Sequence, residues 1–368
     1  MGHSFMTDIP FGISVGRYRT GQAIVWAAFF LMLVALAVQI LHVTGRLGFG
    51  FDTWRPVLYA YAIWGVALSA GQVIMRGDDG WRALFILPAA LFTVAVVLFP
   101  TVFAIAAAFT DWNLSSAAPP RFNGLDNFRR MMSDPYFWNA LFNMGFYLLA
   151  VVVQYALAFG LALLLNAEIR ARKFFRVAFL LPFMLSPVAV SWMIGKSMMD
   201  FRTGPISDLM RLLGWSEPSF FTSPWIARIS VATLDAWVWI PFSVILLLAG
   251  LQAIPRDLRE ASKIDGASGW QNFWEITFPL MMPVSITALL VRIIFQLKLA
   301  DIVINTTYGG PGGATDTISS FIFREYRDRA NVGYGTMMAM FYLVCIVIFL
   351  LLFLKFAEKL THRTQGDA

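Results

Sequence analysis

The chain has 368 residues, of which 58% are hydrophobic and only 14% are charged. This apolar fraction exceeds what the core of one soluble domain needs, because only a protein that faces lipid needs apolar side chains outside as well as inside. The formal charge of +6 would suit a nucleic-acid partner, but the basic residues lie mostly in short segments between apolar runs, as they do in the loops of membrane proteins. Composition therefore predicts an all-α polytopic membrane protein and argues against nucleic-acid binding.

Apolar runs of the length that crosses a bilayer as a helix, about 20 residues, recur along the chain. Eight candidate spans result, at about 21–43, 56–75, 84–110, 138–166, 175–198, 229–251, 283–305 and 335–356. The first is too long for the apolar core of a signal peptide and lacks an A-x-A-like cleavage site, so we expect it to be retained. We predict two domains, a two-helix membrane extension at 1–80 and a six-helix core at 81–368.

The predicted topology follows from the even number of spans, which puts both termini on one side of the membrane. The basic segments 170–176 and 355–368 indicate that this side is the cytoplasm, because cytoplasmic loops carry an excess of Lys and Arg.

A polar segment at 259–270, REASKIDGASGW, interrupts the apolar pattern between the sixth and seventh spans. Pro255 is placed to begin a short helix, and Gly266 is a natural stop for it. One face of this helix carries Leu258, Ala261 and Ile264. Two prolines further on are predicted to break the next helix and redirect the chain into the membrane, namely Pro279 and Pro283.

The exposed face of this helix has unusually small side chains. Ala261 and Ser262 would let the backbone of another protein approach closely, and Glu260 and Asp265 would add charged contacts at the rim. The alternative is an ordinary amphipathic connector that lies on the bilayer.

The same segment resembles the EAA loop of ABC-importer permease subunits, whose pattern runs E-A-A-x-x-D-G-A, then Phe, an aliphatic residue and P-x-x-x-P. The matching residues are Glu260, Ala261, Asp265, Gly266, Ala267, Phe273, Ile276, Pro279 and Pro283. Ser262 stands where the family usually has a second Ala. A wider similarity to the maltose-type carbohydrate permeases covers about residues 84–356, and the first two spans have no counterpart in six-helix members.

This resemblance implies the permease subunit of an ATP-driven, binding-protein-dependent importer of a carbohydrate or sugar derivative in the cell inner membrane. In that family the EAA loop is the coupling helix that docks on an ATPase subunit, a role that falls here to Glu260, Ala261, Ser262, Asp265 and Gly266. The loop, residues 252–282, would then lie in the cytoplasm. The implied partners are two cytoplasmic ATPase subunits, a second homologous permease subunit and an external solute-binding protein.

No enzymatic or metal chemistry is predicted for this chain. The pattern G-x-x-x-x-G-K-[ST] is missing, and the glycine run 309–313 lacks the lysine that would reach a phosphate, so we expect an external turn there. The single cysteine, Cys345, lies in an apolar run, and the three histidines are scattered. The chain is therefore expected to hold no cofactor, and ATP with Mg²⁺ would be hydrolysed by the partner ATPases.

Charged residues inside the predicted spans mark candidate transport residues, because a charge at the bilayer centre costs about 2.5–3.5 kcal/mol on insertion scales. Four stand out: Asp235, Arg292, Lys298 and Asp301. Lys298 and Asp301 are three residues apart and are predicted to form a structural ion pair. Arg292 has no acidic neighbour at helical spacing in its own span, so its partner must come from another helix or from the cargo.

The resemblance also implies a sugar site within the membrane. The maltose permease lines its site with residues that match Asp235, Trp237, Val238, Trp239, Arg292, Phe295, Gln296 and Leu299, and Phe183 falls near a further contact. Aromatic rings suit the apolar faces of a pyranose, whereas Gln, Asp and Arg suit its hydroxyls. Asp235 stands where an amide is expected, and Arg292 where a small hydroxyl is expected. Two interpretations of Arg292 stay open, a salt bridge with Asp235 or contact with a phosphate, sulfonate or carboxylate on a sugar derivative.

Two other classes of function compete with the importer. In an ion-coupled secondary transporter of a polar solute, the four intramembrane charges would form a coupling network. In a membrane sensor, residues 255–283 would hold a signalling partner. Dependence on ATP and on a co-purifying ATPase separates the importer from both.

Overall fold

The computed structural model describes residues 14–43, 47–167 and 172–366. Over these residues the regular structure is helical, and β-pairing is limited to the isolated bridges Thr110–Phe122 and Asn113–Asn331. Among the described residues, seven helices are long and apolar enough to cross a membrane, and the number is eight if one bent pair of helices is taken as a single span. The all-α polytopic membrane fold is therefore confirmed.

The chain forms two compact units, Met1–Phe103 and Ala104–Ala368. The division between these compact units falls inside the third span, and the domain boundary at 80/81 stays a prediction. The division falls there because the first half of that span packs against the second span, where the Tyr61 hydroxyl donates a hydrogen bond to the Leu91 carbonyl at 2.6 Å.

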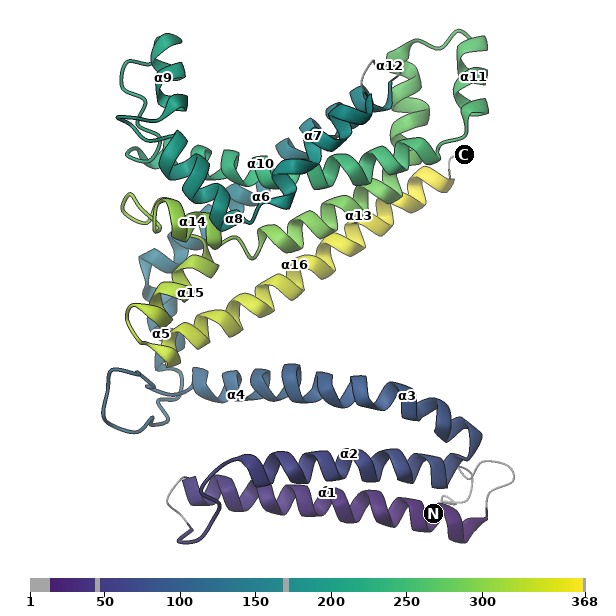
Figure 1. Cartoon of the computed structure of the whole chain (residues 1–368), viewed down its shortest axis with the longest axis vertical. Coiled ribbons are helices and arrows are strands. Elements are labelled where there is room, and N and C mark those ends of the chain that lie inside the picture. The colour runs from purple at the N-terminus through teal and green to yellow at the C-terminus, as the bar shows by residue number, and fades with distance from the viewer. Residues whose placement is uncertain (1–13, 44–46, 168–171, 367–368) are drawn as a thin grey trace. The chain divides into compact units, whose positions relative to one another are not determined.

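The first unit contains α1 (Val15–Val43), α2 (Arg55–Arg76), α3 (Asp78–Thr93), a π-helical segment (Val94–Leu98) and the first part of α4 (Phe99–Ala108). Helices α1 and α2 lie side by side along their length (Figure 1). Glycines allow this close approach, because a Cβ atom on Gly71 would lie 2.3 Å from a methyl group of Val25 and 3.1 Å from the Gly21 carbonyl oxygen. Small residues at a helix–helix contact are the usual means of close packing in membranes.

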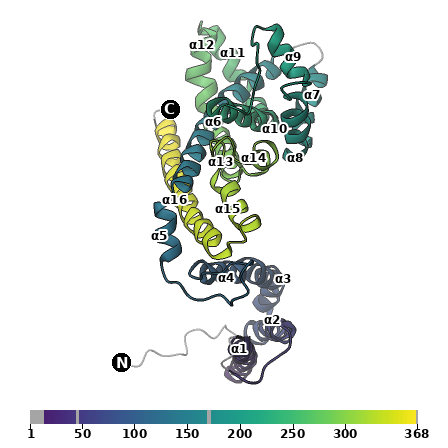
Figure 2. The ribbon, with the colours of Figure 1, turned by 90° about the vertical axis from the view of Figure 1, so that its left-hand side faces the viewer.

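The second unit carries the residues that the sequence predicts to be functional. Its helices are α5 (Asp126–Ser133), α6 (Pro135–Asn166), α7 (Arg172–Met184), α8 (Pro187–Val190), a π-helical segment (Ser191–Met198), α9 (Pro205–Leu212), α10 (Pro224–Ala253), α11 (Arg256–Ile264), α12 (Gly269–Gln271), a second π-helical segment (Asn272–Thr277), α13 (Phe278–Gln296), α14 (Asp301–Thr306), α15 (Ile318–Arg327) and α16 (Val332–Gly366). Helices α11 and α12 lie at one end of this unit, and α9, α14 and α15 lie at the other (Figure 1). Helix α5 runs beside the first turns of α16 in both views (Figures 1 and 2).

One apolar core cluster of the second unit lies where α6, α10 and α13 meet. Ala158 and Ala162 of α6 are fully buried against Leu247 of α10 and Met281 of α13. The small alanine side chains let the helices approach closely, so that polar residues at the same depth on all three helices come within hydrogen-bonding reach.

The fifth predicted span, 175–198, is not one straight helix. It divides into two helices that meet at an angle of 93° after Met184. Pro187 disfavours helical geometry at the residue before it, and Ser186 is accordingly extended, with φ −67° and ψ 146°. The Ser186 hydroxyl accepts a hydrogen bond from the Ala189 amide at 3.1 Å and so caps the second helix.

The seventh span begins and ends earlier than predicted. The helix runs continuously from Gly269 to Gln296 instead of from 283 to 305. The prediction that Pro279 and Pro283 break this helix is therefore wrong. A π-helical turn precedes Pro279, and changes of hydrogen-bond register of this kind let a membrane helix accommodate proline.

Candidate substrate and coupling sites

A buried polar cluster joins the three core helices. Asp235 of α10 and Arg292 of α13 form an ion pair, and their side chains are 1% and 3% exposed. Gln154 of α6 lies between them. Its amide nitrogen donates to Asp235 Oδ2 at 3.0 Å, and its amide oxygen accepts from Arg292 Nη2 at 2.8 Å and from Nε at 3.2 Å. The structure thus contains the Asp235–Arg292 salt bridge that the sequence left as one of two interpretations.

The cluster carries no net charge, because one guanidinium balances one carboxylate. Two charges in a low-dielectric interior are tolerated only when they are paired and their remaining hydrogen-bonding groups find partners, and Gln154 supplies two of these partners. Sequence reasoning missed Gln154 because the search concentrated on charged residues. An amide isolated in the apolar run of 148–165 was the signal that would have found it.

An aromatic wall borders this cluster. The Trp239 ring lies 4.4 Å from that of Phe295 and 5.9 Å from that of Phe183, measured between centroids. The Arg292 guanidinium carbon lies 5.3 Å from the centre of the Trp239 ring, a cation–π geometry. Phe242, which the sequence analysis did not select, completes the wall at 5.5 Å from Phe183. Three predicted site residues on three helices therefore meet beside the ion pair.

Several polar atoms at this position have no hydrogen-bond partner within the described part of the chain. They are Arg292 Nη1 and both amide atoms of Gln296, which is 1% exposed. Buried polar atoms are nearly always paired, so these unpaired atoms mark a candidate binding position for a polar group. One guanidinium donor with one amide donor and acceptor suits a hydroxyl-bearing group.

Three other predicted site residues lie away from this cluster. Trp237 projects from another face of α10, where it lines an apolar cavity of about 340 Å³ together with Phe179 and Pro182. Val238 and Leu299 are buried in the apolar packing between α10 and α14. They belong to the apolar packing of the unit, whereas the Trp239 and Phe295 rings lie beside the ion pair.

Lys298 and Asp301 differ from their prediction. Helix α13 ends at Gln296, so both residues follow the span, and both side chains are exposed. Within the described residues, which include these two, no ion pair joins them. The expectation of a structural pair depended on a helix that continued to 305.

The predicted coupling helix is present as α11. It ends as expected before Gly266, whose φ of +77° suits glycine. Glu260, Ala261 and Asp265 are exposed. Ser262 differs, because its side chain is 5% exposed and its hydroxyl accepts a hydrogen bond from the Asn272 amide.

Apolar side chains accompany the small ones on this loop. Leu258 is 44% exposed and Ile264 is 86% exposed, and Trp270 is 72% exposed where the next helix begins. Large apolar side chains that are exposed outside the membrane spans are typical of a protein contact. The buried Ser262 therefore links α11 to the following helical segment through Asn272. Ala261, Leu258 and Ile264 are exposed on the outside of α11.

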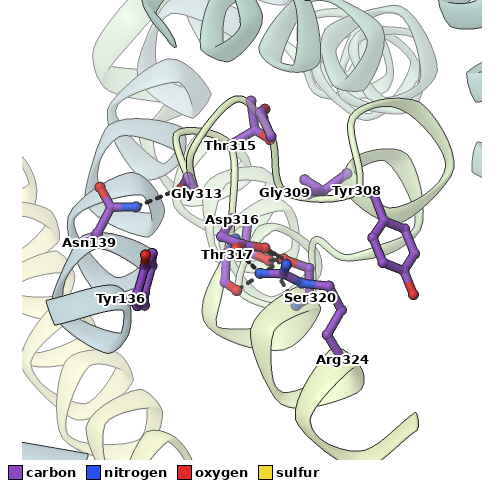
Figure 3. Close-up of polar contacts among 12 residues, drawn as sticks. Tyr136, Asn139, Tyr308, Gly309, Gly313, Thr315, Asp316, Thr317, Ser320 and Arg324 are labelled. Atoms are coloured by element: carbon purple, nitrogen blue, oxygen red, sulfur yellow. Dashed lines mark hydrogen bonds and ion pairs between the residues drawn. The ribbon is translucent and has the colours of Figure 1, made fainter. Parts of the chain in front are cut away.

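The glycine run 309–313 forms a closed turn at the opposite end of the unit. Figure 3 shows Asp316, Ser320 and Arg324 converging beneath it. Asp316 is 2% exposed, forms an ion pair with Arg324 and accepts a hydrogen bond from the Ser320 hydroxyl at 3.0 Å. Burial raises the pKa of Asp316 above its ordinary value, although Arg324 acts in the opposite direction. Asn139 of α6 holds the turn from the side through the Gly313 carbonyl, at 2.6 Å.

Comparison with known proteins places these features in one family. A family model described as "Binding-protein-dependent transport system inner membrane component" matches residues 8–362. The trehalose/maltose transport system permease protein of Thermococcus litoralis is 36% identical over 235 residues, which cover 64% of this chain and 79% of that protein. The sulfoquinovosyl glycerol transport system permease protein of Agrobacterium fabrum is 32% identical over 264 residues, which cover 72% of this chain and 85% of the relative.

The fold is also similar to a solved structure. A chain in the crystal structure of a bacterial ABC transporter involved in import of the acidic polysaccharide alginate matches with a TM-score of 0.67 at 22% identity, and covers 77% of this chain and 96% of that one. A binding-protein-dependent system needs a solute-binding protein as partner, which agrees with the importer and not with an ion-coupled secondary transporter. This chain belongs to the family of binding-protein-dependent transport system inner membrane components, as a multi-pass permease subunit.

Proposed function

We propose that this chain is one permease subunit of an ATP-driven importer that moves a carbohydrate or a sugar derivative through the membrane. The observation that carries the proposal is the site beside Arg292, where unpaired polar atoms lie against an aromatic wall at the depth of the membrane core. Such a combination suits a solute that has both hydroxyl groups and apolar ring faces. The named cargoes of the two relatives, trehalose or maltose and sulfoquinovosyl glycerol, are carbohydrates or carbohydrate derivatives.

Neutral hydroxyl groups fit this site better than a strong anion. Asp235 already balances the charge of Arg292, and Gln154 occupies Nε and Nη2 of the guanidinium. Only Nη1 is left, so the two-pronged contact by which arginine binds an oxyanion is not available without breaking the cluster. Gln296 would supply the second polar contact to the cargo.

Energy would come from partner subunits. In this proposal α11 docks on a cytoplasmic ATPase, a second permease subunit completes the pathway, and ATP with Mg²⁺ is bound and hydrolysed by the two ATPases. The exposed Ala261, with Leu258 and Ile264 beside it, supports a close protein contact at that position. Both chain termini and the α11–α12 loop would then lie in the cytoplasm.

Two tryptophans on α10 provide a matched test. Trp239 belongs to the aromatic wall, whereas Trp237 lines the separate apolar cavity. We expect Trp239→Leu to reduce uptake into proteoliposomes about tenfold, since loss of one stacked ring removes up to about 1.5 kcal/mol. Trp237→Leu should leave uptake within about twofold of the original protein, as a loss of less than 0.5 kcal/mol.

The measurement needs an identified cargo. A thermal-shift screen of the cognate binding protein against sugars, sugar phosphates and sulfonated sugars would supply one, and ATPase activity stimulated by that protein would verify assembly. If the two leucine variants transport equally well while both remain assembled, the cargo does not pass against Trp239 and the proposed site is wrong.

A further inference from the structure

A buried arginine other than Arg292 lies near the N-terminal end of α10. Arg228 is on the second turn of this helix, and its side chain is only 8% exposed. Its Nε donates a hydrogen bond to the Asn143 side-chain oxygen of α6 at 2.8 Å. Asn143 is itself fixed, because its amide nitrogen donates to the carbonyls of Gly313 and Asp316 at 3.1 and 2.9 Å. The guanidinium is therefore held in one orientation by the fold.

This guanidinium has no counter-charge within the described part of the protein. The neighbouring carboxylate of Asp316 is committed to Arg324, and Arg292 has Asp235. No described carboxylate lies within 4.0 Å of Arg228, and its two Nη groups have no described hydrogen-bond partner. A guanidinium that is nine-tenths buried and has no counter-charge favours an anion at its Nη groups, because an unpaired charge is unfavourable in a mostly buried position.

Two aromatic rings flank the guanidinium. Its central carbon lies 4.8 Å from the centre of the Trp225 ring and 5.7 Å from that of Phe142. Cation–π contact with both rings partly offsets burial of the charge, but it leaves the fork of Nη groups unused. The fork is the part of arginine that matches the geometry of a phosphate.

The surroundings of the two rings indicate where that phosphate comes from. Trp225 and Phe142 are themselves more than half exposed, although Arg228 between them is buried. Below Phe142, Leu149 and Val153 continue the same face of α6, and both are more than 60% exposed. An exposed apolar stripe on a spanning helix suits a lipid chain, and a Trp near the end of such a helix is typical of the headgroup level.

We propose that Arg228 binds the phosphodiester group of a phospholipid, with Trp225 and Phe142 on either side of it and an acyl chain along Leu149 and Val153. The ligand class is any glycerophospholipid, because the contact is made to the phosphate and not to the headgroup beyond it. Through Asn143, the bound lipid also stabilises the turn around Gly313.

Native mass spectrometry of the whole detergent-purified transporter complex tests this site. The complex is titrated separately with dioleoylphosphatidylglycerol, dioleoylphosphatidylcholine, dioleoylglycerol and soluble glycerol phosphate. Both phospholipids should bind with similar affinity, and dioleoylglycerol, which lacks the phosphate, should bind at least about tenfold more weakly. Arg228→Gln should remove this preference, and Arg228→Lys, which keeps the charge but loses the fork, should reduce it only in part.

Arg211→Gln is the matched control. Arg211 lies in the last turn of α9 and also stacks on an aromatic ring, at 5.5 Å from Phe201, but it is paired with Asp208. The control should bind both phospholipids as the original protein does.

Three outcomes would overturn the proposal. Equal binding of dioleoylglycerol and phospholipid by the original complex would show that the lipid binds through its acyl chains alone and that there is no phosphate site. This outcome is measured on the original protein and so does not depend on whether a variant folds. Equal phospholipid binding by Arg228→Gln would remove Arg228 from the contact. Arg228-dependent binding of soluble glycerol phosphate as tight as that of phospholipid would assign the site to a soluble oxyanion instead of a lipid.

Discussion

At the scale of single residues, the Arg292–Asp235 pair with Gln154 concentrates the polar groups of the membrane core in one place. Each charge is tolerated because the other is present, and the amide fills the hydrogen-bonding positions that the pair leaves over. The three residues come from three different helices. Substitution of either charged residue would therefore leave an unpaired charge and also weaken the contact among α6, α10 and α13.

Removal of one charge should cost more than removal of both. We expect Arg292→Gln to destabilise the folded protein by about 3–5 kcal/mol, since it strands a buried carboxylate. Adding Asp235→Asn should recover more than half of that loss, because two neutral amides replace the ion pair. Thermal unfolding of the purified complex and its folded yield in detergent are the measurements.

The exposed pair Arg129–Asp126, with 3.5 Å between nitrogen and oxygen, is the control for this prediction. Arg129→Gln should change stability by less than about 1 kcal/mol, as is usual for surface ion pairs. A double variant at Asp235 and Arg292 that is as unstable as the sum of its single variants would show that these two residues do not compensate each other.

The search for charged residues in the predicted spans found the buried ion pair, although it also selected Lys298 and Asp301, which lie beyond the end of α13. Asp235 and Arg292 were found because charge is rare at membrane depth, whereas Gln154 was missed because it is uncharged. Trp237 and Trp239 were grouped by resemblance, yet they lie two residues apart and so project from different sides of a helix. Which side faces the site depends on how α10 packs, and the sequence pattern contains no such information.

At the scale of elements, the glycine turn at 308–317 depends on one close contact. Gly309 has φ +85°, and a Cβ atom there would lie 2.3 Å from Asp316 Oδ1. Gly312 also has positive φ, +59°, but nothing lies within 4 Å of the position where its Cβ would be. Substitution of Gly312 would therefore test the cost of the backbone conformation alone, whereas substitution of Gly309 would add a steric clash with Asp316.

Alanine substitutions should reveal this difference. Gly312→Ala is expected to cost about 1–2 kcal/mol, the usual cost of left-handed backbone for an L residue. Gly309→Ala carries the same backbone cost and also displaces the Asp316 carboxylate from Arg324, so it should cost at least about 2 kcal/mol more. Limited proteolysis of the turn and thermal unfolding measure both, and equal effects of the two substitutions would contradict the close contact.

The spans themselves were largely predictable, because about 20 apolar residues identify a membrane helix whatever its neighbours are. The exceptions lie at prolines. Pro187 breaks the fifth span, yet Pro279 and Pro283 leave the seventh continuous. Hydropathy cannot distinguish these cases, because the outcome depends on whether a cap such as Ser186 or a π-helical turn such as Asn272–Thr277 satisfies the displaced backbone groups.

At the scale of the whole molecule, the proposed coupling and cargo sites lie at different depths of the second unit. The α11–α12 loop is at one end (Figure 1), and Arg292 is one turn from the far end of α13. Transport by this arrangement requires that an event at the loop reach a cluster in the membrane core.

A bulky side chain at the loop should interrupt that transfer without damage to the membrane domain. We expect Ala261→Trp to weaken ATPase association by about tenfold to hundredfold, because overpacking of a close contact costs about 1–3 kcal/mol. Co-purification of the ATPase and hydrolysis stimulated by the binding protein are measured together. Ala118→Trp, at an exposed position of another loop, is the control and should change neither. Normal values of both for Ala261→Trp would rule out a coupling role for this face.

The continuous helix from Gly269 to Gln296 connects the loop directly to the ion pair. At a rise of 1.5 Å per residue, Gly269 and Arg292 are about 35 Å apart along it, so a tilt of about 5° around Gly269 moves Arg292 sideways by about 3 Å. A displacement of that size separates a hydrogen-bonded ion pair. In the proposed importer, a small rotation at the loop that the helix transmits past its π-helical turn at 272–277 would therefore break the Arg292–Asp235 contact.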